Sequence, residues 1–303
     1  MHPPATAALR AANRRGVLAI SAGMASFVAN DSLVKYVSES LPSAQLILLR
    51  GVFATVLLLG VSYALGAFGQ LRALLNRRVM VRAGIDATAT LIYLTSLFHL
   101  PIGNAVAISL ATPLVITLFA ILLFKERVGI GRWLAIATGF AGVLMIVQPA
   151  GSAFNVYAVL CLVGTLFHAC RDLMTRTIDP RIPSVVVTLS TAVAVTLFSG
   201  VWVTFGAWQP VAWQQLALLA AASVFLSAGY YLLIIAMRAG EMSVIVPFRY
   251  VGLLFALVLG YLVWNEVPNL LAWCGIALLA LAGYYVLRSQ RQHPRAELEP
   301  APE

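Results

Sequence analysis

The segment GMASFVANDSLVKYVSESLPS, residues Gly23 to Ser43, decides the fold because a second segment built on the same plan follows 141 positions later. The second segment, Gly164 to Ser184, reads GTLFHACRDLMTRTIDPRIPS and aligns with the first without a gap. Both are mostly apolar, and each carries an acidic and a basic residue four positions apart: Asp31 and Lys35 in the first, Asp172 and Arg176 in the second. Weaker matches join residues 103–108 to 240–245 and Glu126 to Glu266. The sequence therefore predicts two halves that share one structural plan.

The composition indicates a membrane protein. The 303 residues are 61% hydrophobic and 10% charged, and the mean hydropathy is +0.92. A helix that crosses a bilayer needs about 20 apolar residues. Ten such runs fit the chain: 16–38, 43–68, 78–100, 103–124, 130–149, 154–176, 184–206, 213–238, 243–264 and 269–288. We expect an all-α integral membrane protein with ten transmembrane helices, which leaves no room for a soluble catalytic or nucleic-acid-binding domain.

The number of runs in each half predicts how the halves are oriented. Five spans per half is an odd number, so the second half enters the membrane from the side opposite to the first. We expect a short tail at 1–15, a first repeat at 16–149, a second repeat at 150–288 and a tail at 289–303. Such 5+5 inverted-topology repeats are typical of secondary transporters, in which two halves rock about a central site to give alternating access.

The basic residues predict the orientation in the membrane. If the N-terminus is cytoplasmic, most of the 20 Lys and Arg residues lie at cytoplasmic ends, and the loops near 39–42, 101–102, 150–153, 207–212 and 265–268 contain none. This is the positive-inside bias of membrane proteins. We therefore expect a multi-pass protein of the cell inner membrane with both termini in the cytoplasm. The net charge of +9 reports this topology and does not indicate a nucleic-acid partner.

Two short motifs place the chain near a known family. An apolar span ends in Phe124-Lys125-Glu126, and its partner in the second half ends in Asn265-Glu266. With ten spans and a five-plus-five repeat, residues 16–288 resemble the drug/metabolite transporter superfamily, and the EamA-type branch fits best. Residues Asn30 to Lys35, followed by Leu49-Arg50, are similar to members that move S-adenosylmethionine or riboflavin. The resemblance implies a central cavity and a small organic substrate that is amino acid-like, nucleoside-like or flavin-like.

The two repeat-matched pairs carry charge into the membrane, which is costly and needs a reason. Residues at positions i and i+4 of a helix can meet, so Asp31 can pair with Lys35 and Asp172 with Arg176. Each pair is then either a local ion pair that lets a helix end cross the interface or a gate that opens on one side at a time. Glu126 and Glu266 stand where the next helix begins, and we expect them to cap that helix.

Charges that occur in only one half are candidates for substrate contact. Arg50 lies inside the second span, and Arg249 and Tyr250 lie inside the ninth. Neither arginine has a basic match in the other half. Arg50 either extends to the interface or faces the cavity to bind a carboxylate, a phosphate or an electron-rich ring. Further candidate substrate contacts are the aromatic residues Tyr93 and Tyr230 and the ionisable His168, for which packing is the alternative.

Asp86 is the candidate for proton coupling. It follows Arg82 by one helical turn, so an ion pair near the cytoplasm is one interpretation. The other is a buried acid that carries a proton through the transport cycle.

Two other classes of function compete with transport. A membrane-embedded enzyme needs a nucleophile with a base or a metal-ligand constellation, and the sequence offers neither H-E-x-x-H nor G-x-S-x-G. A scaffold that does not transport predicts packed ion pairs and no polar cavity. We expect no catalytic residues, no metal and no cofactor. The expected partners are a small-molecule substrate and the lipid bilayer, with the chain as a monomer or a homodimer.

Overall fold

The structure is a computed structural model that describes residues 4–124, 130–148, 155–175, 177–179, 181–239 and 245–292. Within these ranges every regular element is helical. The elements are α1 (Pro4–Ser38), α2 (Ser43–Ala64), η1 (Phe68–Leu75), α3 (Arg77–Leu97), α4 (Ile102–Ser109), α5 (Thr112–Phe124), α6 (Ile130–Val147), α7 (Val156–Thr175), α8 (Ser184–Val203), α9 (Trp213–Ala239), η2 (Val246–Tyr250), α11 (Val251–Trp264) and α12 (Leu270–Gln292).

The helices have the length and composition of membrane spans. Six segments of the described chain are long and apolar enough to cross a bilayer: 11–38, 43–64, 102–119, 156–175, 184–203 and 213–233. Three shorter apolar helices cover 133–147, 248–264 and 270–285. Helix α3 instead carries four charged residues, Arg77, Arg78, Arg82 and Asp86. The expectation of an all-α protein with several membrane spans is confirmed.

Two of the expected spans are not single continuous α-helices. The run 103–124 divides into α4 and α5, and the described part of the run 243–264 passes from the tight helix η2 directly into α11. Pro113 explains the first break, because proline has no N–H to donate to the carbonyl of Ser109. The hydroxyl of Thr112 donates to that carbonyl instead, at 2.6 Å. A backbone polar group inside a membrane protein must be satisfied in some such way.

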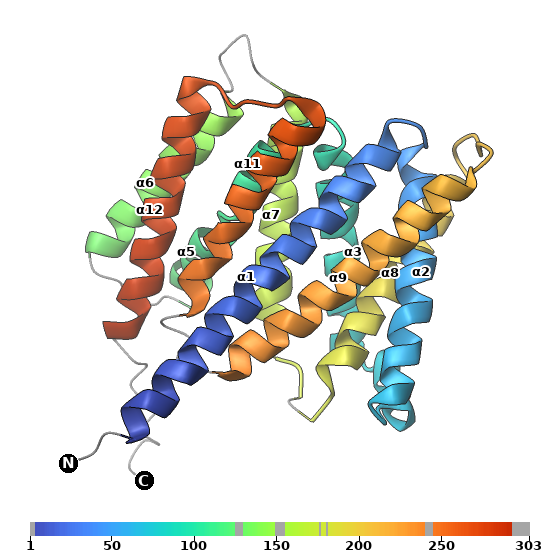
Figure 1. The fold of residues 1–303 in the computed structure, drawn as a ribbon, viewed down its shortest axis with the longest axis horizontal. Helices are drawn as coiled ribbons and strands as arrows, with labels where there is room; N and C mark the ends of the chain where they lie inside the picture. The colour runs from blue at the N-terminus through green and yellow to red at the C-terminus, as the bar shows by residue number, and fades with distance from the viewer. Residues whose placement is uncertain are drawn as a thin grey trace.

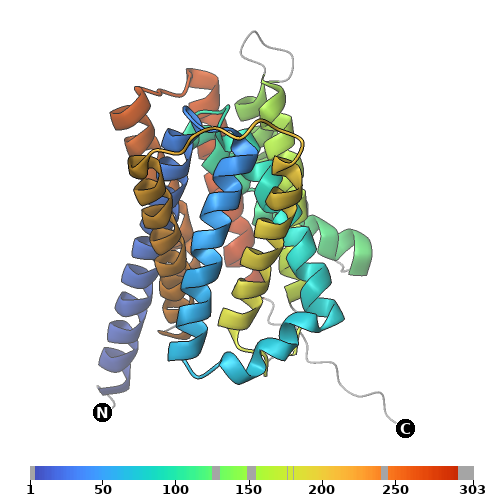
Figure 2. The ribbon, with the colours of Figure 1, turned by 90° about the vertical axis from the view of Figure 1, so that its right-hand side faces the viewer.

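Helices from the two halves pack against each other (Figure 1). Helix α1 crosses α9, α3 packs on α7, α6 on α12 and α2 on α8. Figure 2 shows α2 beside α8 with η1 at their lower end. Gly23 lets α1 approach α9, since a Cβ there would lie 3.3 Å from the carbonyl oxygen of Gly229. Its repeat match Gly164 lets α7 approach α3 in the same way, 3.5 Å from the carbonyl oxygen of Ala89.

The closest approach is between α6 and α12. A Cβ on Gly142 would lie 2.7 Å from the carbonyl oxygen of Gly275, and one on Gly275 would lie 2.5 Å from that of Gly142. Small residues at helix crossings allow such contact between backbones. This pair forms one side of the molecule, and α2 with α8 forms the other (Figure 1). The remaining helices lie between these two pairs.

Candidate functional site

A cavity of about 800 Å³ lies among α1, α2, α3, α7, α8 and α9. This volume is within the range of small-molecule sites. The irregular parts of these two runs contribute to the wall, the first with Ser109, Leu110, Thr112 and Pro113 and the second with Arg249 and Tyr250. All six side chains that the sequence offered as substrate contacts line the cavity: Arg50, Tyr93, His168, Tyr230, Arg249 and Tyr250. Asp31 and Asp172 also line it.

The cavity extends toward one end of the molecule. Its lining includes Ile178, Asp179 and Ile182, which connect α7 to α8. We call this the Arg78 end, because Arg78 donates to the carbonyl of Thr177 there, at 3.0 Å. At the opposite end, Gln45 forms two hydrogen bonds with the backbone of Gln209, of 2.7 and 3.0 Å. The connection between α8 and α9 is therefore fastened to α2 at that second end, which contributes no described residue to the cavity lining.

The closed end is centred on Lys35, and we call it the Lys35 end. The Lys35 ammonium donates to Glu266 Oε1 and to the carbonyl of Leu100, both at 2.5 Å, and lies 4.9 Å from the ring centre of Trp264. The expected partner, Asp31, is not the one that Lys35 uses. Within the described residues Asp31 forms no ion pair, because Lys35 turns toward α11 and not back along its own helix. The matching pair cannot be compared, since Arg176 lies outside the described residues.

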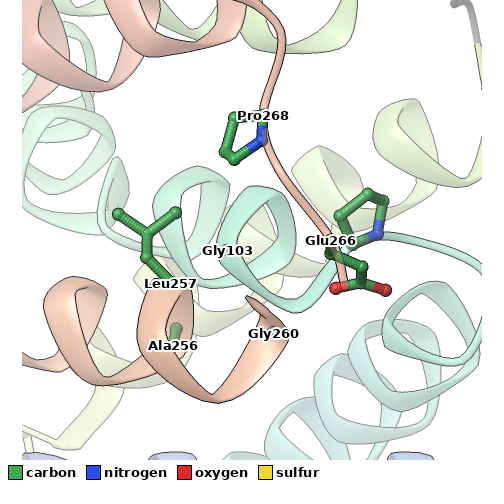
Figure 3. A pocket seen from close by; sticks show the side chains of 7 residues that line it. Gly103, Ala256, Leu257, Gly260, Glu266 and Pro268 are labelled. Atoms are coloured by element: carbon green, nitrogen blue, oxygen red, sulfur yellow. The ribbon is translucent and has the colours of Figure 1, made fainter. Parts of the chain in front are cut away.

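Glu266 also differs from its expected role. Its Oε2 accepts a hydrogen bond from the backbone N–H of Ile102, at 2.8 Å, so it caps the start of α4 and not the helix that follows it in sequence. Figure 3 shows Glu266 beside Gly103 and Gly260, at a pocket between α4 and α11. That pocket measures about 10 Å³, which leaves room for about one water molecule and no substrate. Glu126, the repeat match, lies outside the described residues.

The turn at Asn265 aims Glu266 at these partners. Asn265 has φ 55° and ψ 30°, a left-handed conformation that asparagine tolerates better than most residues. The N–H of Glu266 then bonds back to the carbonyl of Gly260, at 3.0 Å. This is a common way to end a helix, and it reverses the chain at once. The Asn-Glu motif of the sequence is therefore a helix stop that presents a carboxylate.

Asp31 and Arg50 are joined indirectly through Asn30. Arg50 Nη1 donates to Asn30 Oδ1 at 3.1 Å, and Asn30 Nδ2 donates to Asp31 Oδ1 at 2.8 Å. The other oxygen of Asp31 accepts a hydrogen bond from the Tyr93 hydroxyl, at 2.8 Å. Arg50 is only 6% exposed, and its Nε has no hydrogen-bond partner. This arginine therefore faces the cavity and does not extend to the membrane interface.

A second cluster of charges surrounds Asp86. Its carboxylate pairs with Arg82 at 3.2 Å, as the sequence suggested, and also with Arg171 at 2.9 Å. Thr191 adds a hydrogen bond of 2.8 Å. Arg171 in turn pairs with Asp172, at 2.9 Å. Two arginines and two aspartates thus balance one another, and this cluster links α3, α7 and α8.

Arg249 and the aromatic side chains complete the wall. Within the described part of the chain, Arg249 has neither an ion pair nor a hydrogen bond. Tyr93 faces His168 with ring centres 6.0 Å apart, and Tyr230 packs edge-on against Phe27 at 5.1 Å. The Tyr250 hydroxyl is buried without a partner. The cavity therefore offers aromatic faces together with an arginine, Arg249, that pairs directly with none of the described carboxylates.

Sequence reasoning missed three residues of these clusters. Asn30 is the link between Arg50 and Asp31, Thr191 bonds Asp86, and Glu266 is the partner of Lys35. The repeat held a signal for the first two, because Asn30 matches Arg171 and Arg50 matches Thr191. Each half therefore has polar side chains at these two repeat positions, but the residue types differ between the halves. Only the partner of Lys35 required knowledge of how the helices cross.

Comparison with known proteins agrees with this architecture. The model of the EamA-like transporter family matches the chain twice, at residues 14–148 and 155–288. A known crystal structure superposes with a TM-score of 0.62 at 18% identity and covers 92% of this chain and 98% of the other. The chain belongs to the EamA-like transporter family. It is therefore a membrane transport protein and not an enzyme.

Relatives within the family carry different substrates. The chain is 27% identical to the pseudopaline exporter CntI of Pseudomonas aeruginosa over 92% of its length and 98% of that protein. It is 26% identical to a riboflavin transporter of Vibrio cholerae, which covers 92% and 94% of the two chains. It is 23% identical to an S-adenosylmethionine uptake transporter of Rickettsia prowazekii, with 87% and 89% covered. The family thus includes both exporters and uptake systems for small metabolites.

Proposed function

We propose that the chain moves a small organic metabolite with an acidic group and a planar ring across the inner membrane, and that the 800 Å³ cavity is its binding site. One observation carries the proposal: Arg50 and Arg249 line this cavity and form no ion pair within the described residues. A guanidinium in apolar surroundings is costly unless an anion neutralises it. A substrate carboxylate or phosphate supplies that charge.

The charges around the cavity support an acidic substrate. Arg82, Arg171, Asp86 and Asp172 balance one another, and Arg50 is offset by Asp31 through Asn30. Arg249 forms no ion pair within the described residues, and the carboxylate that acts on it, Asp172, is already paired with Arg171. An arginine binds carboxylate and phosphate through two parallel N–H groups, which gives direction as well as charge. Tyr93, His168, Tyr230 and Tyr250 offer faces on which a planar ring can stack.

Alternating access between two inverted five-helix halves is the mechanism that we propose. Three observations support it. The family model matches each half separately. The helix contacts occur in pairs related by exchange of the halves: α1 with α9 corresponds to α7 with α3, and α1 with α11 to α7 with α5. Helices α6 and α12, and likewise α2 and α8, pack on their own counterparts. The helices make ten membrane crossings if α4 with α5, and η2 with α11, each cross the bilayer once.

The structure has the features of one state in such a cycle. The cavity extends toward the Arg78 end, where the basic residues gather, and is sealed at the Lys35 end. By the positive-inside rule the Arg78 end is cytoplasmic. We therefore propose that Lys35 and Glu266 form the outer gate, that both termini are cytoplasmic, and that substrate exchanges with the cytoplasm in this state.

A matched transport screen tests the proposal. The purified full-length chain is reconstituted in liposomes, and uptake of labelled compounds is compared with vesicles that lack protein. Two pairs isolate the acidic group: tyrosine against tyramine, which lacks the carboxylate, and flavin mononucleotide against riboflavin, which lacks the phosphate. S-adenosylmethionine completes the set. We expect the acidic member of at least one pair to be preferred. Flux equal to empty vesicles for every compound contradicts transport of this class, and preference for tyramine and riboflavin contradicts the acidic group.

A further inference from the structure

We propose that Asp31 binds a proton that is carried through the transport cycle, and that Arg50 serves both Asp31 and an acidic substrate. The first part, the proton site at Asp31, does not depend on which substrate the protein carries. The second part rests on the proposed function, because it requires an anion at Arg50.

Asp31 differs from the other carboxylates at the cavity. Three described carboxylates line it: Asp31, Asp172 and Asp179. Asp172 is ion-paired with Arg171, and Asp179 is exposed in the connection to α8, where it accepts the N–H of Arg181 at 2.9 Å. Asp31 is half-buried, and its hydrogen-bond donors in the described part of the chain are Asn30 and Tyr93, which are uncharged. It is the carboxylate whose charge costs most at this cavity and that cavity water can still reach.

Asp86, the residue that the sequence offered for this role, lies in the opposite situation. It is 2% exposed and does not line the cavity. Two arginines and Thr191 hold its ionised form. Protonation would break two ion pairs at once and leave two arginines to share one remaining aspartate. The geometry therefore favours Asp86 as the centre of a structural cluster and Asp31 as the proton site.

The groups around Asp31 determine how its charge is balanced. The titratable side chains that act on it are Arg50 on α2, Tyr93 on α3 and Cys161 on α7. Helices α9, α11 and η2 also pack on α1. They add no acidic side chain there, and their titratable groups at the cavity are Tyr230, Arg249 and Tyr250. Among the described residues Arg50 is thus the cation that acts on Asp31, and Asn30 bridges the two through hydrogen bonds of 3.1 and 2.8 Å.

A shared cation couples the proton to the substrate. Arg50 lines the cavity and, within the described residues, donates a hydrogen bond only through Nη1, which leaves its guanidinium able to bind an anion there. An anion bound there repels the Asp31 carboxylate and partly neutralises the Arg50 charge that stabilises it. Anion binding therefore favours protonation of Asp31. By linkage a proton on Asp31 favours anion binding to the same extent. The proton comes from cavity water on one side and returns to water on the other, so an anion and a proton cross together.

The test needs no substrate. The purified chain in lipid nanodiscs is titrated while infrared difference spectra record the C=O stretch that only protonated carboxyl groups give. We expect one such band to appear as the pH falls from about 8 to about 5, near the window in which perturbed carboxyl groups titrate. Asp31→Asn should remove this band, whereas Asp86→Asn and the loop control Asp179→Asn should retain it. Persistence of the band in Asp31→Asn, or its loss in Asp86→Asn alone, overturns the proposal, and so does absence of any titrating band in the wild type.

Two more variants keep the test decisive. If Asp31→Asn does not fold, Asp31→Glu is used, and its band should titrate with a changed midpoint, whereas an unchanged midpoint overturns the assignment. Arg50→Gln should move the midpoint to higher pH by about one unit or more, because it removes the compensating cation. Arg78→Gln, which removes an exposed cation at the Arg78 end, should leave the midpoint in place. A midpoint that ignores Arg50→Gln disproves the shared cation. The infrared titration uses no substrate. Its outcomes can therefore be interpreted even if the transport screen finds no substrate.

Discussion

Lys35 and Glu266 lie 231 positions apart in the sequence and are joined by a contact of 2.5 Å. Their side chains are 7% and 21% exposed, so the pair is largely shielded from solvent. Because Glu266 also caps α4 through Ile102, this one carboxylate ties α1, α4 and α11 together at the Lys35 end. Separation of these three helices at that end requires the pair to break.

We predict energetic coupling between these two residues. Lys35→Gln and Glu266→Gln each leave an unpaired charge, so each should lower the melting temperature. The double change should lower it by less than the sum of the two single effects. Glutamine at 266 can still accept from Ile102, so the cycle isolates the charge. The coupling should fall within about 0.5–3 kcal/mol, the range for residues in contact. It is measured from thermal unfolding of the purified variants.

The matched control is a second cycle between Lys35→Gln and Asp31→Asn. Because Lys35 does not contact Asp31, the two effects should add within about 0.5 kcal/mol. Additivity between Lys35 and Glu266 together with coupling between Lys35 and Asp31 would contradict this prediction. It would support the ion pair within α1 that the sequence suggested.

We predict that Arg50 and Arg249 set substrate affinity. Arg50→Gln and Arg249→Gln should each raise the half-saturating concentration of an acidic substrate about tenfold or more, because a charge-assisted hydrogen bond contributes about 1.5–3 kcal/mol. Arg50→Lys keeps the charge without the planar fork and should fall between Gln and the wild type. The measurement is concentration-dependent uptake into liposomes. Arg78→Gln is the control for a lost positive charge, and an equal loss in this variant would argue against direct binding.

We predict the sidedness of the two ends by cysteine labelling. After Cys161, Cys170 and Cys274 are replaced, Ala207→Cys at the Lys35 end should react with an impermeant maleimide in intact cells. Arg78→Cys at the other end should react only after the cells are opened. Both positions are exposed in the structure, so accessibility does not bias the comparison. Labelling of Arg78→Cys from outside would invert the proposed orientation.

We predict that a single methyl group at the α6–α12 crossing destabilises the fold. Gly142→Ala places a Cβ 2.7 Å from a backbone oxygen, which must shift at a cost of about 1–3 kcal/mol. Gly60→Ala is the matched control, since nothing lies within 4 Å of its Cβ on α2. That change should be neutral or stabilising by up to about 1 kcal/mol, because alanine restricts the unfolded chain. Equal melting temperatures for the two variants would contradict the close crossing.

The sequence predicted local features well and contacts across the fold poorly. Apolar runs and the basic ends indicated the helices, and the lack of a repeat match at Arg50 and Arg249 identified two residues of the cavity wall. The break between Ser109 and Thr112 and the tight helix before Val251 were not predicted, because one proline changes the average hydropathy of a long apolar run very little. Lys35 was assigned to Asp31 since periodicity reports neighbours within one helix. Its partner depends on the crossing of α1 with α11, which no local pattern encodes.

The crossing of α1 with α9, and of α3 with α7, has a consequence for biosynthesis. Helices leave the ribosome in order, so α1 enters the bilayer long before α9 exists. Its Gly23 face then borders lipid, where small residues pack poorly, until the second half has been inserted. The packing of α1 and α3 is consequently completed only after the second half has been inserted. A ribosome that stalls after residue 148 leaves a membrane-bound intermediate with α1 and α3 unpaired, which is the form that membrane quality-control proteases should recognise.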